Sequence, residues 1–177
     1  MVIQDNRHGH GHGHSHAHEH CVKMAKREDG SPWWADFPEP RSVAALVDPD
    51  RVLRLLQEDE CLAEGSKDFL LVDARRSDCT GGTVRGAINL PAHSFYPTRK
   101  TLYGLCKQAG IKKVIFYCGS SLGRGPRCAA WFQDYVTEIG GDLESQVMAG
   151  GIRGWVQAYG GSMMDGYDAR AWQAETR

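Results

Sequence analysis

Residues 114–127 read V-I-F-Y-C-G-S-S-L-G-R-G-P-R, a pattern that predicts a strand, a turn and a helix start in direct succession. The run Val114–Tyr117 is short and wholly apolar, which is typical of a strand buried on both faces of a parallel sheet. Gly125-Pro126 predicts the first turn of a helix, because proline is tolerated there and its φ angle suits the helix. Cys118 is therefore predicted at the carboxyl end of a strand, where open parallel sheets bind their ligands.

The alternation of strands and helices extends to both sides of this unit. Phe69–Val72 and Gln146–Met148 are further runs of strand length, and Ala87–Leu90 predicts a short extended piece. Helical spacing of apolar residues and capping residues predict the helices. The first is expected after Asp48, and the others have their apolar positions between Leu102 and Ala109, between Cys128 and Ile139, and between Ile152 and Tyr159. The fold class is α/β, with a central parallel sheet flanked by helices in three layers.

The length of the chain limits the number of domains. It has 177 residues, 41% of them hydrophobic, which suffices for one core but not for two catalytic domains. We expect residues 1–42 to form a disordered, histidine-rich and polar arm, residues 43–160 to form the catalytic domain, and residues 161–177 to form a C-terminal tail.

Charge and composition exclude some classes of partner. The formal net charge is -1 and the pI is about 6.7, so nothing favours a nucleic acid or an anionic membrane as partner. No apolar run reaches the ~18 residues of a membrane span, and the N-terminus lacks the apolar core of a signal peptide. We expect a cytoplasmic or nuclear protein, or one found in both places.

The cytoplasm and the nucleus are reducing compartments, in which disulfides are rare. The cysteines also show no paired metal-ligand spacing, so we predict that they are free thiols. The six cysteines are Cys21, Cys61, Cys79, Cys106, Cys118 and Cys128.

Residues 8–20 alternate histidine with small or polar residues, so this stretch cannot form a core. It is either an affinity tag or neutral tail, or a weak and open-ended site for zinc, nickel or copper. The candidate ligands are His8, His10, His12, His14, His16, His18 and His20. We expect no metal site in the catalytic domain, and no cofactor.

The loop after Cys118 has the composition of an oxyanion site. Small residues let successive backbone N–H groups converge on one point, and the following helix directs its positive dipole end there. Arg124 can hold two oxygens of a tetrahedral anion with its planar guanidinium, and the same positive field favours a thiolate at Cys118. The alternative is an inert buried cysteine followed by a simple turn. The loop residues are Gly119, Ser120, Ser121, Leu122 and Gly123.

The Cys-x5-Arg pattern with Gly-Pro-Arg after it resembles the catalytic loop of two groups of enzymes with the rhodanese fold. These are the cell-cycle dual-specificity phosphatases of the Cdc-twenty-five type and the eukaryotic arsenate reductases. Further stretches resemble rhodanese-like domains, so that the resemblance covers roughly Val43 to Gly160. The stretches are Asp73–Asp78, Gly81-Gly82, Gly86–Pro91 and Gly150–Trp155.

The resemblance implies roles for charged residues near the loop. Asp73 and Arg75 are candidate catalytic residues, but their family counterparts favour a structural ion pair that supports the site. Asp78 is expected to act similarly. Arg127 either adds positive potential or is a solvated residue of the first helical turn.

The chain departs from the family pattern at two positions. Tyr117 precedes the cysteine where the family has histidine, and Ala74 stands where the cell-cycle phosphatases carry a second cysteine. Cys79 or Cys128 is left as a candidate to replace that second cysteine.

Four functions remain open, and all of them use the same loop. The leading one is a protein tyrosine phosphatase-like hydrolase, which cleaves phosphotyrosine or small phosphoesters through a cysteinyl-phosphate. The runner-up is an arsenate reductase that takes electrons from glutathione and glutaredoxin. Sulfur transfer from thiosulfate and a non-catalytic module that binds anions or phosphoproteins are the others. The resemblance favours phosphate or arsenate over sulfane sulfur, because sulfurtransferases of this fold usually have four residues in the loop and this chain has five between Cys118 and Arg124. None of the five is an acid.

Overall fold

The computed structural model describes residues 26–62 and 67–173, and the chain divides into two compact units at Pro38 and Glu39. In the described part of the first unit, a bridge between Lys26 and Pro32 and an ion pair between Arg27 and Asp36 form a small turn structure. All remaining elements belong to the second unit. The histidine run 8–20 lies outside the described residues.

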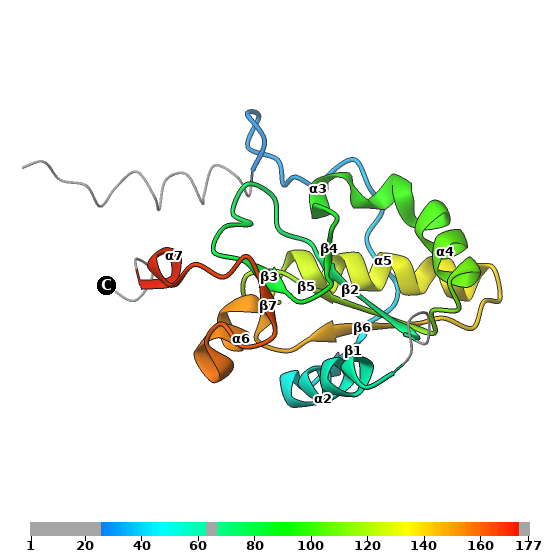
Figure 1. Ribbon diagram of the computed structural model, residues 1–177. Helices are drawn as coiled ribbons and strands as arrows, with labels where there is room; N and C mark the ends of the chain where they lie inside the picture. Colours follow the sequence, from blue (N-terminus) through cyan, green and yellow to red (C-terminus); the bar gives the residue numbers. More distant parts are fainter. Residues whose placement is uncertain (1–25, 63–66, 174–177) are drawn as a thin grey trace, which may run out of the picture. The chain divides into compact units, whose positions relative to one another are not determined.

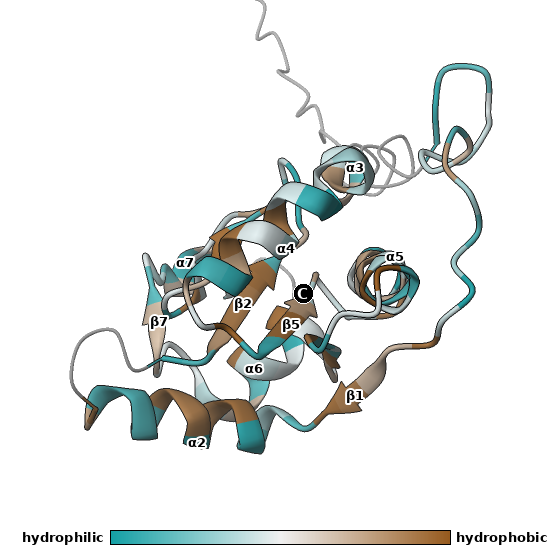
Figure 2. Cartoon of the chain, turned by 90° about the vertical axis from the view of Figure 1, so that its right-hand side faces the viewer, coloured by the Kyte–Doolittle hydropathy of each residue, from teal (hydrophilic) through white to brown (hydrophobic). Residues whose placement is uncertain are grey.

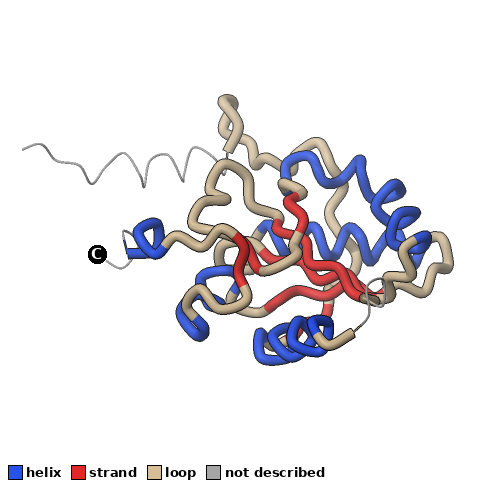
Figure 3. The backbone as a smooth tube through the Cα atoms, viewed as in Figure 1, coloured by secondary structure: helices blue, strands red, loops and turns tan. Residues whose placement is uncertain are grey.

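The second unit contains a central sheet of five parallel strands in the order β1-β6-β5-β2-β4, as Figures 1 and 3 show. The predicted parallel sheet is therefore confirmed. The strands predicted at 69–72, 114–117 and 146–148 agree with the observed ones to within two residues. The strands are β1 (Ala45–Val47), β2 (Phe69–Asp73), β4 (Ile88–Asn89), β5 (Lys113–Tyr117) and β6 (Glu144–Met148).

Helices cover both faces of the sheet, which gives the predicted three layers. On one face, residues of α2 and α6 join Leu71, Ile115 and Tyr117 in the main apolar cluster. On the other face, Phe116 packs against the rings of Phe95 and Phe132, at centroid distances of 5.3 and 5.8 Å. Figure 2 shows the apolar strands β2 and β5 between these layers. The helices are α2 (Pro49–Glu60), α3 (Ala92–Phe95), η1 (Tyr96–Thr98), α4 (Arg99–Gln108), α5 (Arg124–Glu138) and α6 (Gly151–Tyr159).

Residues 161–173, assigned to a tail from the sequence, contain two more elements, β7 (Met164–Asp165) and α7 (Ala169–Gln173). Strand β7 pairs antiparallel with β3 (Thr83–Val84). The Trp172 indole donates a hydrogen bond of 2.8 Å to the carbonyl oxygen of Gly81, and a Cβ on Gly82 would lie 2.8 Å from the Asp165 carbonyl oxygen. The paired glycines thus allow this segment to pack closely. In the described ranges, no helix has both the length and the apolar character needed to cross a membrane.

The first turn of α6 is attached to the loop after β5 through backbone hydrogen bonds. The amides of Ile152 and Arg153 donate to the carbonyl oxygens of Cys118 and Gly119, both at 3.0 Å. Gly151 makes this approach possible, since its φ is 60° and a Cβ there would lie 2.5 Å from both carbonyl oxygens. The position of α6 is therefore coupled to that of the loop.

Gly151→Ala should lower the free energy of unfolding more than Gly110→Ala, in which the new side chain strains the backbone but meets no other atom. Gly110 is the matched control, because its φ is 72° and no atom lies within 4 Å of a Cβ built there. Gly110→Ala should cost ~1 kcal/mol from the left-handed conformation. Gly151→Ala should cost ~3 kcal/mol or more, since the methyl group must displace backbone atoms. Urea unfolding of both variants measures the difference, and equal losses would contradict the close packing at Gly151.

Candidate active site

Cys118 and Arg124 lie at the two ends of a tight loop that joins β5 to α5. Cys118 follows the last residue of β5 and is 3% exposed, and Arg124 is the first residue of α5. The helix start crosses close to the strand end, since a Cβ on Gly125 would lie 3.2 Å from the Tyr117 carbonyl carbon. The structure thus brings Cys118, the loop Gly119–Gly123 and Arg124 together at the carboxyl edge of the sheet.

Ser121 combines two unfavourable features within this loop. Its φ is 56°, a left-handed conformation that costs a residue with a side chain ~1–2 kcal/mol. Its side-chain oxygen is buried and has no hydrogen-bond partner among the described residues. An unsatisfied buried hydroxyl costs a further ~1–3 kcal/mol. Strain and an unsatisfied polar group in one residue are typical of functional sites.

Arg124 holds a carboxylate with both of its terminal nitrogens. Nη1 and Nη2 donate hydrogen bonds of 2.7 and 2.6 Å to the two oxygens of Asp78. Burial alone would raise the pKa of Asp78, but the hydrogen bonds and charge of Arg124 outweigh it and lower this pKa to about 2. Asp78 is therefore ionised at neutral pH. The guanidinium of Arg124 has five N–H groups, so hydrogen-bonding capacity remains after this pair is made.

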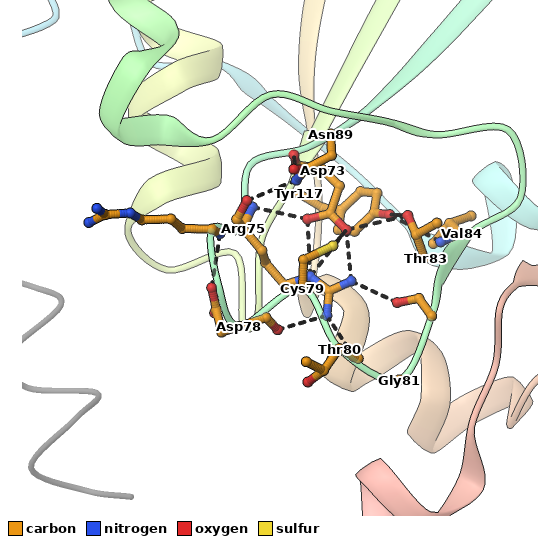
Figure 4. A network of polar contacts seen from close by, with 12 residues as sticks. Asp73, Arg75, Asp78, Cys79, Thr80, Gly81, Thr83, Val84, Asn89 and Tyr117 are labelled. Carbon is orange, nitrogen blue, oxygen red and sulfur yellow. Dashed lines mark hydrogen bonds and ion pairs between the residues drawn. The ribbon is translucent and has the colours of Figure 1, made fainter.

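The buried ion pair of Asp73 and Arg75 organises the neighbouring loop (Figure 4). Arg75 Nη2 donates hydrogen bonds of 2.7 Å to Asp73 Oδ2 and to the Gly82 carbonyl oxygen, and both charged side chains are at most 2% exposed. The Asn89 side chain donates to the carbonyl oxygens of Asp73 and Arg75. These contacts fix the loop of residues 73–82, which carries Asp78.

The side chain of Tyr117 connects the end of β5 to β3 through hydrogen bonds. Its hydroxyl lies 2.6 Å from the Thr83 side-chain oxygen and accepts a 3.0 Å hydrogen bond from the Val84 amide (Figure 4). The pKa of Tyr117 is raised, mainly by burial, so the phenol is neutral. The residue that precedes the cysteine is thus bound to β3.

Arg127 lies one turn into α5 and makes a 3.0 Å ion pair with Glu39. The sequence left its role open between added positive potential and a solvated position. In the structure its side chain is 20% exposed and its guanidinium contacts a carboxylate outside the loop.

A small, open pocket with a volume of about 30 Å³ adjoins the loop on the side of Gly119. Arg153 was not singled out by the sequence, yet its guanidinium lies beside the loop. A Cβ on Gly119 would lie 3.8 Å from Arg153 Cζ and 3.7 Å from Arg124 Nη2, so two guanidinium groups flank this glycine. The pocket is lined by Arg75, Asp78, Thr80, Gly119, Ile152, Arg153, Ala171 and Trp172.

The cysteines proposed as a second thiol lie in unfavourable surroundings. Burial raises the pKa of Cys128, whose side chain is fully buried, and it also raises the pKa of Cys79. Cys79 lies near a carboxylate, with its sulfur 3.6 Å from Asp73 Oδ2. The described ranges hold no group of three or more histidine, cysteine or acidic side chains that suits a metal ion.

The chain is similar to known proteins in sequence. A family model described as rhodanese-like domain matches residues 48–158. Arsenical-resistance protein 2 of Saccharomyces cerevisiae is 36% identical over 98 residues, which span 50% of this chain and 75% of that protein.

Two solved structures are also similar. Ygr203w, described as a yeast protein tyrosine phosphatase of the rhodanese family, is 26% identical with a TM-score of 0.59, over 74% of this chain and 99% of that one. An As-Sb reductase from Leishmania major has a TM-score of 0.60 over 68% of this chain and 84% of that one. At 23% identity, it shows a shared fold.

The ion pair of Asp78 and Arg124 should make stability depend on pH in the acid range. The folded-state pKa of Asp78 lies below its ordinary value of 3.8, so the pair stabilises the fold above that value and is lost as the pH falls through about 2. Between pH 4 and pH 2 the unmodified protein should lose ~1 kcal/mol more than Asp78→Asn, after allowance for partial exposure of the pair. Urea unfolding across this range measures the difference, with the exposed Glu138→Gln as control. If the free energies of unfolding of the unmodified protein and of Asp78→Asn fall equally with pH, the ion pair of Asp78 and Arg124 does not contribute to stability.

Proposed function

This chain belongs to the family of rhodanese-like domains, and on that premise we propose that it is a cysteine-dependent enzyme that reduces arsenate. One observation carries the proposal: Arg124, six residues after Cys118, binds both oxygens of the Asp78 carboxylate. A guanidinium placed in this way can bind two oxygens of a tetrahedral oxyanion beside the cysteine. The buried hydroxyl of Ser121 would gain an acceptor from the same anion.

The two acidic residues beside the loop in the described part of the chain are both held in ion pairs, which favours arsenate over an unactivated phosphoester. Loss of an alkoxide from a phosphoester needs a general acid, which contributes ~10²- to 10⁴-fold. Asp78 is ionised because its pKa is lowered to about 2, and Asp73 is held in the buried pair with Arg75. Arsenate avoids this requirement, because its own protonated oxygen leaves. The relative named for arsenical resistance supports the same choice.

The reaction balances with two external thiols. The Cys118 thiolate attacks arsenic, an As–S bond forms, and a hydroxide leaves and is protonated to water. The two thiols then supply two electrons, so that arsenic is released as arsenite, the thiols become a disulfide, and Cys118 returns to its thiolate. Overall, one arsenate and two thiols give one arsenite, one disulfide and one water. Glutathione and glutaredoxin are the proposed thiol donors.

Hydrolysis of aryl phosphates is the second candidate. The same nucleophile and arginine would form a cysteinyl-phosphate, and an aryloxide needs less help from an acid than an alkoxide does. The likeness to Ygr203w at 26% identity supports this candidate.

A side-by-side assay separates the candidates. The purified full chain is given arsenate with glutathione and glutaredoxin, an aryl phosphate, phosphoserine, or thiosulfate with cyanide. We expect arsenite formation at the highest rate, slower release of the phenol and no cleavage of phosphoserine. Cys118→Ser should abolish turnover but still bind tungstate, as measured by calorimetry. Turnover that survives in Cys118→Ser would disprove the mechanism, and thiocyanate as the main product would favour sulfur transfer.

Arg124→Lys should slow the reaction strongly although it keeps the charge. Lysine cannot hold two oxygens with a planar pair of donors, so the loss should be ~2–4 kcal/mol in transition-state stabilisation. Arg127→Lys is the matched control, since it lies in the same first turn of α5 and pairs with Glu39. We expect the control to retain nearly full kcat/KM. Similar values for both variants would show that another group binds the oxyanion.

A further inference from the structure

The pocket beside Gly119 adjoins the proposed nucleophile loop, and Gly119 forms part of its lining. The other walls come from the loop of residues 73–82, from the first turn of α6, and from Ala171 and Trp172 of α7. Figure 4 shows the first of these walls with Asp78 and Thr80. A molecule bound here would lie next to a covalent adduct on Cys118.

The described cysteines are poorly suited to release such an adduct. Cys106 and Cys128 are buried thiols, and burial raises the pKa of both, that of Cys106 to about 11. Burial and the neighbouring Asp73 carboxylate raise the pKa of Cys79. Cys61 follows α2, which connects the carboxyl end of β1 to the amino end of β2. Cys61 therefore lies near the amino ends of the parallel strands, whereas Cys118 lies at their carboxyl ends. Among the described residues, none of these cysteines is therefore suited to release the adduct, and we expect a thiol from solution to do so.

Arg153 gives the pocket a preference for negative charge. Two of the three charged residues in its lining are arginines, Arg75 and Arg153, and the third is Asp78. Arg75 is buried against Asp73, whereas Arg153 is exposed on the first turn of α6. The Arg153 amide donates a hydrogen bond of 3.0 Å to the Gly119 carbonyl oxygen, which fixes the backbone of Arg153 beside the loop. A Cβ on Gly119 would lie 3.8 Å from Arg153 Cζ, so the guanidinium also lies beside the loop. Guanidinium groups recognise carboxylates.

We propose that this pocket binds the reducing thiol, and that Arg153 selects a thiol that carries a carboxylate. The proposal rests on the arsenate reduction proposed above. The carboxylate would pair with Arg153, the methylene groups would lie against Ile152 and Trp172, and the sulfur would face the adduct on Cys118. The thiol attacks the sulfur of Cys118, an S–S bond forms, and the As–S bond breaks with its electron pair left on arsenic, which is released as arsenite. A second thiol then breaks the mixed disulfide, which gives the external disulfide and returns Cys118 to its thiolate.

Three small thiols of different charge test the proposal: 3-mercaptopropionate, 2-mercaptoethanol and cysteamine. The rate of arsenite formation by the full chain is measured at saturating arsenate as a function of each thiol. Every variant is compared with the unmodified protein for the same thiol, so differences in thiol reactivity cancel. Arg153→Gln should lower kcat/KM about tenfold for 3-mercaptopropionate and leave 2-mercaptoethanol nearly unchanged. Arg153→Glu should shift the preference toward cysteamine.

Arg54→Gln is the control, because it removes an exposed arginine from α2, outside the pocket lining. It should leave all three values unchanged. An equal loss for all three thiols in Arg153→Gln would overturn the assignment, since it would show that Arg153 acts on arsenate or on the fold. Arsenite formed in a single turnover without added thiol would also overturn it, because an internal cysteine, Cys21 included, would then be the reductant. Absence of arsenite with all three thiols, and also with glutathione and glutaredoxin, would refute the proposed function itself.

Discussion

The buried ion pair of Asp73 and Arg75 is the interaction on which the rest of the site depends. Two charges taken out of water are tolerated only when their remaining hydrogen-bonding groups are satisfied. Here the backbone satisfies them, since Arg75 donates to carbonyl oxygens of the following loop and the Asp73 carboxylate also accepts from the Arg75 amide. The pair therefore stabilises one loop conformation. That conformation places Asp78 within reach of Arg124.

Arg124 and Arg75 both form ion pairs before any substrate is bound. Arg124 pairs with Asp78, and Arg75 pairs with Asp73. An incoming oxyanion must share Arg124 with Asp78 or displace it. Selectivity for the anion would then depend on how well its oxygens compete with a carboxylate already in place.

Local sequence patterns predicted the sheet and the loop because these depend on neighbouring residues. The apolar run before Cys118, the small residues after it and Pro126 define β5, the loop and α5 within one short stretch. Strand β1 escaped prediction because it is an edge strand, with Leu46 70% exposed. Strands β3 and β7 have two residues each and exist through their mutual pairing. The pair of Arg124 and Asp78 and the position of Arg153 beside Gly119 arise from tertiary contacts between distant segments.

The packing of α7 on Gly81 has a consequence for the order in which the site is completed during synthesis. Strand β3 and the paired glycines leave the ribosome well before β7 and Trp172 do. The antiparallel pairing of β3 with β7 can therefore form only after β7 has been synthesised. The five-stranded sheet and the nucleophile loop contain no residue beyond Met148, whereas one wall of the pocket comes from Ala171 and Trp172. A nascent chain can therefore form the oxyanion loop before the adjoining pocket is closed. The nucleophile would be assembled first, and the pocket beside it would be finished last.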